Sequence, residues 1–250
     1  MSLDALPKEV LQEVFLLEKQ KNKLDTREKA QENFLDYAQH VYEGFIVGSH
    51  HKIIAEKLEL IAQGKLKRLI VNMPPRHTKS EFASYLLPAW IIGKNPKAKI
   101  MQVSHNAELS QRFGRKVRNL VDSEEYKKVF QNVTLSQDSK AAGRWETNQG
   151  GEYYAAGVGG ALAGRGADLF IIDDPHSEQD ALSPTAMESA YEWYTSGPRQ
   201  RLQTCGSIFV VMTRWNTKDL TGMLIKAQKE LKADQWEAVS YTHLTLPTKA

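Results

Sequence analysis

Two residues that can bind phosphate and a metal ion, Lys79 and Ser80, follow a turn after the apolar run Arg68 to Met73. A loop that binds nucleotide phosphates needs converging backbone N–H groups, a lysine that reaches the outer phosphate oxygens, and a hydroxyl that binds Mg²⁺. Such a loop opens a helix, whose N-terminus favours anions. Lys79, Ser80 and the amphipathic segment after them supply the lysine, the hydroxyl and the helix, so "RLIVNMPPRHTKSE" has the outline of this loop.

The same stretch lacks the two glycines of the usual pattern, whose positions are taken by Met73 and Thr78. A β-branched threonine resists a positive φ angle, which costs about 1–3 kcal/mol when it is forced. Pro74 and Pro75 have no N–H to donate, so residues 76 to 80 have to make the cradle. Taken alone, the stretch also fits a strand, a turn and a helix that contain a Lys-Ser pair by chance.

Arg76 can compensate in part for the missing glycines, because a guanidinium binds phosphate through two parallel hydrogen bonds. We expect His77 to shape the loop rather than to take part in catalysis. The residues expected to contact the nucleotide are therefore Arg76, His77, Thr78, Lys79 and Ser80.

A pair of acids, Asp173 and Asp174, closes a second apolar run, Leu169 to Ile172. Two adjacent buried carboxylates are costly without a cation, so the pair predicts a metal ion or cationic neighbours. In ATPases with a phosphate-binding loop, the first acid holds Mg²⁺ and the next can polarise the attacking water. The alternative is a strand that runs into a turn at Asp-Asp-Pro.

A third polar strand end is Thr213, which follows the apolar run in "SIFVVMTRWNTKDL". We expect it near the outer phosphate, where it would sense the state of the nucleotide. The alternative is that Thr213 caps a helix that begins near Thr217 and that Arg214 is a surface cation.

Arg165 lies between two glycines in the run "YYAAGVGGALAGRGADL", whose composition is typical of a mobile loop. An arginine displayed in this way can contact phosphate within its own chain or across a subunit boundary. A solvated turn is the alternative.

Alternating strands and helices predict an α/β fold with a mostly parallel central sheet flanked by helices. Residues 4–42 are helical and charged, with an apolar stripe that includes Val10, Val14 and Leu17. The expected helices beyond this segment are 51–63, ending at Gly64; 81–92, ending at Gly93; 107–121; and one after Pro184. The expected strands are 68–73, 99–104, 152–156, 168–173 and 207–213.

The composition fits one large α/β domain, because 41% of the 250 residues are hydrophobic and 25% are charged. Lysine and arginine exceed the acids by 33 to 30, which permits a nucleic-acid partner without requiring one. One cysteine excludes an internal disulfide framework and makes a reducing compartment the default. Neither a signal peptide nor a long apolar span is present, so we expect a protein that is not exported and has no membrane partner.

The composition changes after Ala238, where "VSYTHLTLPTKA" has one lysine and no acid. This string resembles a translated sequencing adapter, so we expect residues 239–250 to be a non-native tail that lies outside the fold. The alternative is a natural β-like tail.

In their order along the chain, "VNMPPRHTKSE", "GVGGALAGRGADLFIIDDP" and "TRW" resemble the large terminase subunit of tailed bacteriophages and their prophages. The resemblance covers roughly Phe34 to Glu237. Relatives have glycine where this chain has Thr78, whereas the Pro-Pro-Arg start of the loop is shared. The family implies a P-loop NTPase of the additional-strand, catalytic-acid type. We accordingly divide the chain into a helical segment, 1–42, and a motor domain, 43–238.

The resemblance also implies roles for single residues. Lys79 and Arg76 would stabilise the phosphates of ATP, and Ser80 and Asp173 would bind Mg²⁺. Asp174 would polarise water and Thr213 would couple hydrolysis to movement, with Arg165 as a further catalytic candidate. The family's nuclease domain would follow the motor domain, so we expect ATP hydrolysis from this chain without DNA cleavage.

The implied partners are double-stranded DNA, the portal protein, the small terminase subunit and further copies of the chain in a ring, in the cytoplasm of the bacterial host. A packaging motor accepts any DNA sequence, so the contacts would go to the phosphate backbone. Candidate contact residues are Arg112, Arg115, Lys116 and Arg118 on one helix, and Arg199 and Arg201 in a loop. A solvated basic helix face is the alternative.

Two other functions fit parts of the pattern. One is a helicase or a restriction-type translocase, which would need a second motor domain after Trp215. The other is an assembly module that keeps the fold without hydrolysing ATP, which the threonine at position 78 makes conceivable. Mg²⁺-dependent turnover of ATP distinguishes the motor from this module.

Overall fold

The computed structural model describes residues 8–160, 162, 164–230 and 233–241, which form a mixed α/β fold around one eight-stranded sheet. The strand order is β3-β4-β5-β2-β6-β7-β1-β8. The bounds are β1 Arg68–Asn72, β2 Lys99–Ser104, β3 Leu135–Ala141, β4 Arg144–Thr147, β5 Glu152–Gly157, β6 Ala167–Asp173, β7 Leu202–Met212 and β8 Glu237–Ser240. From β5 to β8 all neighbouring strands are parallel. The two pairs at the other edge, β3 with β4 and β4 with β5, are antiparallel, so the sheet is mostly parallel, as expected.

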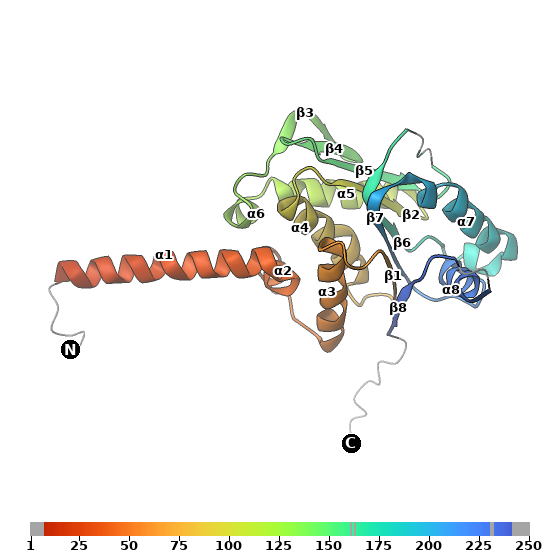
Figure 1. The fold of residues 1–250 in the computed structure, drawn as a ribbon, viewed down its shortest axis with the longest axis horizontal. Coiled ribbons are helices and arrows are strands. Elements are labelled where there is room, and N and C mark those ends of the chain that lie inside the picture. The colour runs from red at the N-terminus through yellow and green to blue at the C-terminus, as the bar shows by residue number, and fades with distance from the viewer. Residues whose placement is uncertain (1–7, 161, 163, 231–232, 242–250) are drawn as a thin grey trace, which may run out of the picture.

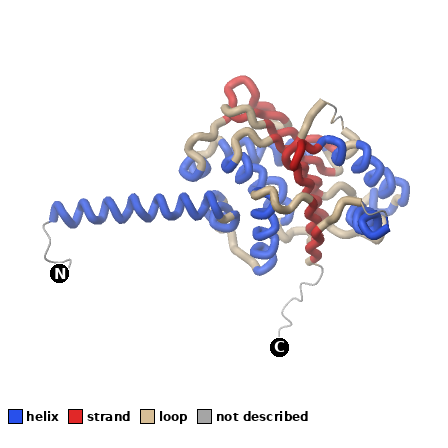
Figure 2. The backbone as a smooth tube through the Cα atoms, viewed as in Figure 1, coloured by secondary structure: helices blue, strands red, loops and turns tan. Residues whose placement is uncertain are grey.

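Helices cover both faces of the sheet, which runs between them in Figure 2. The α-helices are α1 Lys8–Glu32, α2 Phe34–Val41, α3 Ser49–Ala62, α4 Leu87–Lys94, α5 Ala107–Val121, α6 Glu124–Val129, α7 Pro184–Ser196 and α8 Leu220–Glu230. A π-helix, η2 Glu81–Leu86, and two 3₁₀-helices, η3 Asp180–Leu182 and η4 Pro198–Arg201, complete the set. In Figure 1, α7 and α8 lie on one side of the sheet and α3 and α4 on the other.

Side-chain alternation along the strands divides the core into two layers. Leu69 and Val71 of β1 belong to the layer under α3 and α4, whereas Ile70 faces the layer under α7 and α8. The same alternation runs through the neighbouring strands, as expected for strands buried on both faces. The two layers fix which side chains reach the edge of the sheet where β1, β6 and β7 end.

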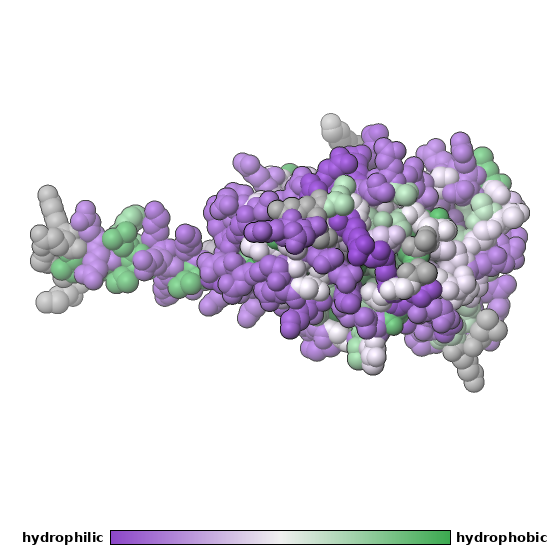
Figure 3. Space-filling model, turned by 90° about the horizontal axis from the view of Figure 1, so that it is seen from above, coloured by the Kyte–Doolittle hydropathy of each residue, from purple (hydrophilic) through white to green (hydrophobic). Residues whose placement is uncertain are grey.

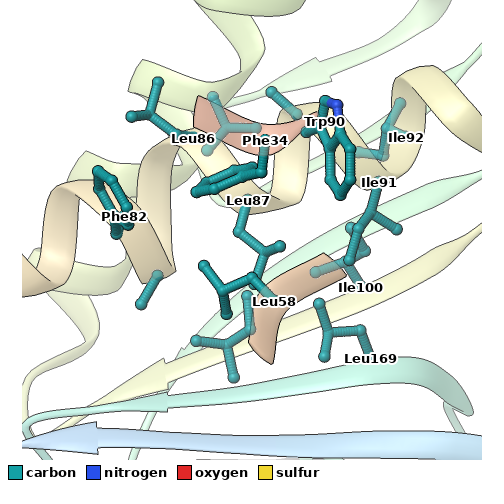
Figure 4. Close-up of a cluster of buried hydrophobic side chains, with 14 of the residues drawn as sticks. Phe34, Leu58, Phe82, Leu86, Leu87, Trp90, Ile91, Ile92, Ile100 and Leu169 are labelled. Carbon is teal, nitrogen blue, oxygen red and sulfur yellow. The ribbon is translucent and has the colours of Figure 1, made fainter. Parts of the chain in front are cut away.

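The N-terminal helices contribute to the core at one end only. Phe34 of α2 packs its ring 5.2 Å from Phe82 and 5.4 Å from Trp90, in the cluster drawn in Figure 4. The sequence analysis placed the start of the motor domain at residue 43. The core extends into the segment before that residue. The outer part of α1 projects from the body (Figures 1 and 3), with Phe15 65% exposed and Leu17 57% exposed. Among the described residues, no helix combines the length and the apolar character needed to span a membrane.

The sheet continues past Ala238, the last residue that the sequence assigned to the fold. Val239 and Ser240 pair in parallel with Val71 and Asn72, and the Tyr241 N–H donates to the Asn72 carbonyl oxygen at 2.8 Å. The expectation that the tail begins outside the fold is corrected for these residues, because β1 offers a free edge with which they pair. Residues 242–250 lie outside the described part, and the foreign origin of the tail stays a prediction.

Gly93 does not end its helix, contrary to the sequence expectation, because α4 continues to Lys94 and Asn95 closes it. The reason for a glycine here is close packing. A Cβ atom at position 93 would lie 2.4 Å from two carbons of the Phe130 ring. The glycine thus allows α4 to approach the segment after α6.

We predict that Gly93→Ala lowers the free energy of unfolding by about 1–3 kcal/mol, because overpacking a core costs that much. The sign of this change distinguishes close packing from an ordinary helix position, because replacing glycine with alanine in an exposed helix interior raises the free energy of unfolding by up to about 1 kcal/mol. Urea unfolding measures the change, with Lys52→Ala at an exposed position of α3 as the control. An unchanged or raised stability would contradict the packing role.

Candidate functional site

The candidate site lies where three parallel strands end at one edge of the sheet. Asn72 of β1 is paired with Met212 of β7, and Asp173 of β6 is paired with Val211 of β7. The loop of residues 73–80, the acid Asp174 and Thr213 therefore leave the sheet side by side. Parallel strands place their carboxyl ends together, which is where open α/β sheets bind ligands.

Lys79 joins all three strand ends. Its Nζ lies 2.7 Å from Asp174 Oδ2 and donates to Thr213 Oγ1 at 3.1 Å. The backbone N–H of Thr213 donates to Asp174 Oδ1 at 2.8 Å, so the same carboxylate binds both partners. The Lys79 side chain is 8% exposed, and a buried ammonium of this kind needs the partners that it has here.

Asp173 is the buried acid of the site, with 1% of its surface exposed. Ser80 Oγ donates to its Oδ1 at 3.0 Å, and Ser84 Oγ donates to its Oδ2 at 2.7 Å. Burial, and next the neighbouring Asp174, raise the pKa of Asp173 to about 7, although the two serine hydrogen bonds and Lys79 act in the opposite direction. A cation at this position would relieve the cost of the buried negative charge.

The oxygen atoms at Asp173 suit Mg²⁺, which also binds water and substrate phosphates. They suit less well a metal ion that is bound by protein side chains alone. Mg²⁺ prefers hard oxygen ligands and usually binds to one or two carboxylates together with waters and substrate phosphates. Ser80 and Asp173 provide a hydroxyl and a carboxylate of this kind. Within the described residues no cluster of three or more His, Cys, Asp or Glu side chains is suited to a metal ion.

The backbone of the loop adopts the left-handed conformation that the missing glycine would have favoured. Thr78 has a φ of 59° and Arg76 a φ of 64°. Arg76 is exposed, and His77 Nδ1 lies 2.8 Å from the Pro75 carbonyl oxygen, a contact that shapes the loop. The strain expected at Thr78 is therefore present, and the surrounding structure has to offset it.

The alternative reading of Thr213 as a helix cap is wrong. Asp219, not Thr213, caps α8, because its Oδ1 accepts the Gly222 N–H at 2.9 Å. Arg214 is held in the turn before α8, where its Nε lies 2.8 Å from Asp219 Oδ2. The Thr213 hydroxyl does not cap α8 and instead accepts a hydrogen bond from Lys79.

Arg165 does not join the other site residues. It lies two residues before β6, whereas Asp173 ends that strand, and β6 alone spans about 20 Å. Its guanidinium lies over the Tyr154 ring, 4.1 Å from the ring centre. Contact with the loop of its own chain is inconsistent with this position; a contact with another subunit stays a prediction.

The structure adds two residues that the sequence analysis missed. Ser84 binds Asp173 as described, and its spacing of four residues from Ser80 is a signal for a shared helix face. His105 follows β2, and its backbone N–H donates to the Asp174 carbonyl oxygen at 3.1 Å. Only the strand order, which no local pattern reveals, brings β2 beside β6.

The basic residues proposed for DNA contact differ in their surroundings. Arg112 and Arg115 are exposed on α5. Lys116 instead pairs with Glu81 at 2.7 Å, and Arg199 pairs with Asp234 at 3.1 Å. Arg118 donates to the side-chain oxygen of its neighbour Asn119, and Arg201 is half-buried.

We predict that Asp173→Asn changes how stability depends on pH when EDTA is present. The folded-state pKa of Asp173 lies above the ordinary 3.8, so the folded parent binds more protons than the unfolded chain between these values. The parent should lose stability as pH rises from about 4 to about 7, at about 1.4 kcal/mol per unit at most, and the variant should lack this loss.

Urea unfolding across this pH range measures the difference, with Asp168→Asn on the exposed start of β6 as the control. Adding Mg²⁺ at pH 8 should stabilise the parent more than the variant. Parallel pH curves for parent and variant would show that Asp173 does not carry the buried charge.

Comparisons with known proteins find similarity to solved structures alone. No protein-family model matches the chain, and no curated protein matches it. The crystal structure of the HK97 bacteriophage large terminase is similar at 15% sequence identity, with a TM-score of 0.49. The alignment covers 79% of this chain and 40% of the terminase, so the chain spans less than half of that protein's length.

Proposed function

We propose that this chain is the ATPase motor part of a phage large terminase subunit, which uses ATP hydrolysis to move double-stranded DNA into a procapsid. The observation that carries the proposal is the contact of Lys79 with both Asp174 and Thr213, beside the contact of Ser80 with Asp173. These are the residues that the sequence resemblance assigns to phosphate, metal and water, and three separate strands bring them within hydrogen-bonding distance.

The order of the strands supports the P-loop assignment. β7 lies between β1, which leads into the loop, and β6, which ends in the acids. In the proposed P-loop NTPase, β7 would be the additional strand that gives the additional-strand type its name, and Thr213 at its end accepts a hydrogen bond from Lys79. A strand inserted here places a third polar group between loop and acids, where a change at the outer phosphate can be sensed.

Each residue of the site has a role that its contacts allow. Lys79, with three donor hydrogens, would bind the outer phosphates of ATP, and the exposed Arg76 would close over them. Ser80 and Asp173 would hold Mg²⁺, which neutralises charge that develops on the phosphates. Ser84 keeps the Asp173 carboxylate in place from the opposite side.

Asp174 would orient the attacking water. Its backbone has a φ of 44°, and Lys79 and the Thr213 N–H each bind one of its carboxylate oxygens. A carboxylate positioned by two donors presents its remaining lone pairs in a fixed direction, which is what a general base requires. Thr213 contacts both this carboxylate and Lys79, so it would transmit the nucleotide state to β7.

The partners follow from the proposed motor activity. Backbone-directed DNA binding would use the exposed Arg112 and Arg115 of α5, while a ring of subunits would dock on the portal with the small terminase subunit. We place this activity in the host cytoplasm, and we assign DNA cleavage to a domain outside this chain.

Phosphate release from Mg-ATP tests the proposal directly. We predict that Lys79→Ala lowers turnover by on the order of 10²-fold or more, since preorganised donors at a developing charge have effects of this size. Thr78→Gly should raise turnover, because glycine adopts a positive φ without strain. Lys52→Ala on α3 is the matched control for loss of a lysine and should leave turnover unchanged.

The assay should cover a range of protein concentrations, with and without duplex DNA, because a ring forms only above a threshold concentration. Circular dichroism has to show that every variant is folded. Folded parent and Thr78→Gly chains that both fail to release phosphate would favour the assembly module that binds nucleotide without hydrolysis.

DNA binding gives a second, independent prediction. The logarithm of the affinity for duplex DNA should fall linearly with the logarithm of the salt concentration, by about 0.9 per phosphate contact. The double variant Arg112→Ala/Arg115→Ala should flatten this slope by about one to two, as measured by fluorescence anisotropy. Lys21→Ala/Lys23→Ala on α1 removes the same charge elsewhere, and an equal effect of both pairs would refute a specific role of α5.

A further inference from the structure

A buried histidine, His51, lies directly under the phosphate-binding loop. It belongs to the first turn of α3 and is 5% exposed. Its ring stacks on Phe82, with centres 4.8 Å apart and planes 23° apart, and Phe45 packs against it at 4.9 Å. These two rings, together with the His50 ring at 3.9 Å, fix the plane of the imidazole.

Hydrogen bonds fix the direction of the ring and its tautomer. The Gly48 N–H donates to His51 Nδ1 at 2.9 Å, so the neutral ring carries its hydrogen on Nε2. Burial, with a smaller effect of His50, lowers the pKa of His51 to about 4, so the ring is neutral at pH 7. His51 therefore presents one N–H donor to the loop.

That donor meets the hydroxyl of Thr78. His51 Nε2 and Thr78 Oγ1 are 2.5 Å apart, and the Thr78 hydroxyl in turn donates to the His77 carbonyl oxygen at 2.6 Å. The hydroxyl accepts one hydrogen bond and donates another, so both of its roles are used. His51, Thr78, Lys79 and Phe82 line one small pocket beneath the loop.

The contact acts on the strained position of the loop. Thr78 has a φ of 59°, which a β-branched residue adopts only when its surroundings hold it there. Thr78 immediately precedes Lys79, so the conformation of its backbone sets where the Lys79 chain starts. A clamp on the Thr78 side chain therefore acts on the placement of the ammonium group.

We propose that His51 is a positioning residue of the phosphate-binding loop: its Nε2–H holds the Thr78 hydroxyl and keeps this threonine in the conformation that a glycine would adopt unaided. The clamp itself rests on the hydrogen bonds above, whereas its effect on nucleotide binding rests on the proposed function. Threonine at position 78 and histidine at position 51 then form one functional unit.

The test is a double-mutant cycle of His51→Phe and Thr78→Gly, read by the affinity for a fluorescent ADP analogue with Mg²⁺. Phenylalanine keeps the ring stacking and removes both hydrogen bonds. His51→Phe should weaken binding about tenfold in the parent, which corresponds to about 1.4 kcal/mol, and less than about twofold in the Thr78→Gly background. An equal loss in both backgrounds would overturn the proposal, since it would show a role independent of Thr78.

A pair of polar variants separates the two hydrogen bonds of His51. His51→Gln reaches as far as Nε2 with an amide donor and should restore most of the affinity lost in His51→Phe. His51→Asn can accept the Gly48 N–H but is too short to reach Thr78, so it should bind as weakly as His51→Phe. The opposite ranking would overturn the proposal, and His40→Phe on α2 is the control for loss of an imidazole elsewhere.

Urea unfolding of the same four chains of the cycle, without nucleotide, separates this inference from the proposed function. If the chain binds no nucleotide, the proposed function is refuted but the clamp between His51 and Thr78 is not. The clamp then still predicts that His51→Phe shifts the unfolding midpoint more in the parent than in the Thr78→Gly background, and equal shifts would overturn it.

Discussion

The site depends on one buried carboxylate, Asp173, which is held in place by two hydroxyl groups at the start of the helical segment that follows the phosphate-binding loop. Ser80 and Ser84 donate to its two oxygens, and through them the start of the π-helix η2 is fixed to the end of β6. A carboxylate that is 1% exposed has to be paired, because an unpaired buried charge is far too costly. Because the end of β6 is buried in the sheet, these hydrogen bonds determine where the loop lies. The position of the loop in turn determines the position of Lys79.

The parallel sheet converts this local contact into a site built from distant parts of the chain. Lys79, Asp174 and Thr213 are separated by 134 residues from first to last, yet Lys79 contacts both others. Each follows a strand that is buried on both faces, so its position is set by two core layers rather than by its own loop. Groups held by rigid strands keep their geometry better than groups held by loops, which suits a site that has to orient a water molecule.

The sequence was informative where a single segment carries the signal. Strand β2 and helix α5 have the bounds expected from their apolar patterns, and the polar ends of β6 and β7 marked Asp173 and Thr213. The β3–β4 hairpin was missed because its first strand, "LSQDSKA", is polar between its two end residues and lacks an apolar alternation. His51 and His105 were missed for another reason: each acts on a residue that only the tertiary fold brings near. The glycine-rich surroundings of Arg165 indicated a displayed side chain, but no local pattern indicated that it lies before the start of β6, away from the strand ends that form the site.

The departure from the usual loop pattern at Thr78 is best understood together with the other strained positions. Four non-glycine residues of the described part have a positive φ, and three of them, Arg76, Thr78 and Asp174, belong to the site. For two of these the structure shows what offsets the strain: His51 holds the Thr78 side chain, and Lys79 and the Thr213 N–H hold that of Asp174. A side-chain contact thus takes over what a glycine does with its backbone alone. Threonine in place of glycine at position 78 therefore ties the loop to α3. A change in the first turn of α3 then acts on the placement of Lys79. A loop with glycine at this position would lack this coupling.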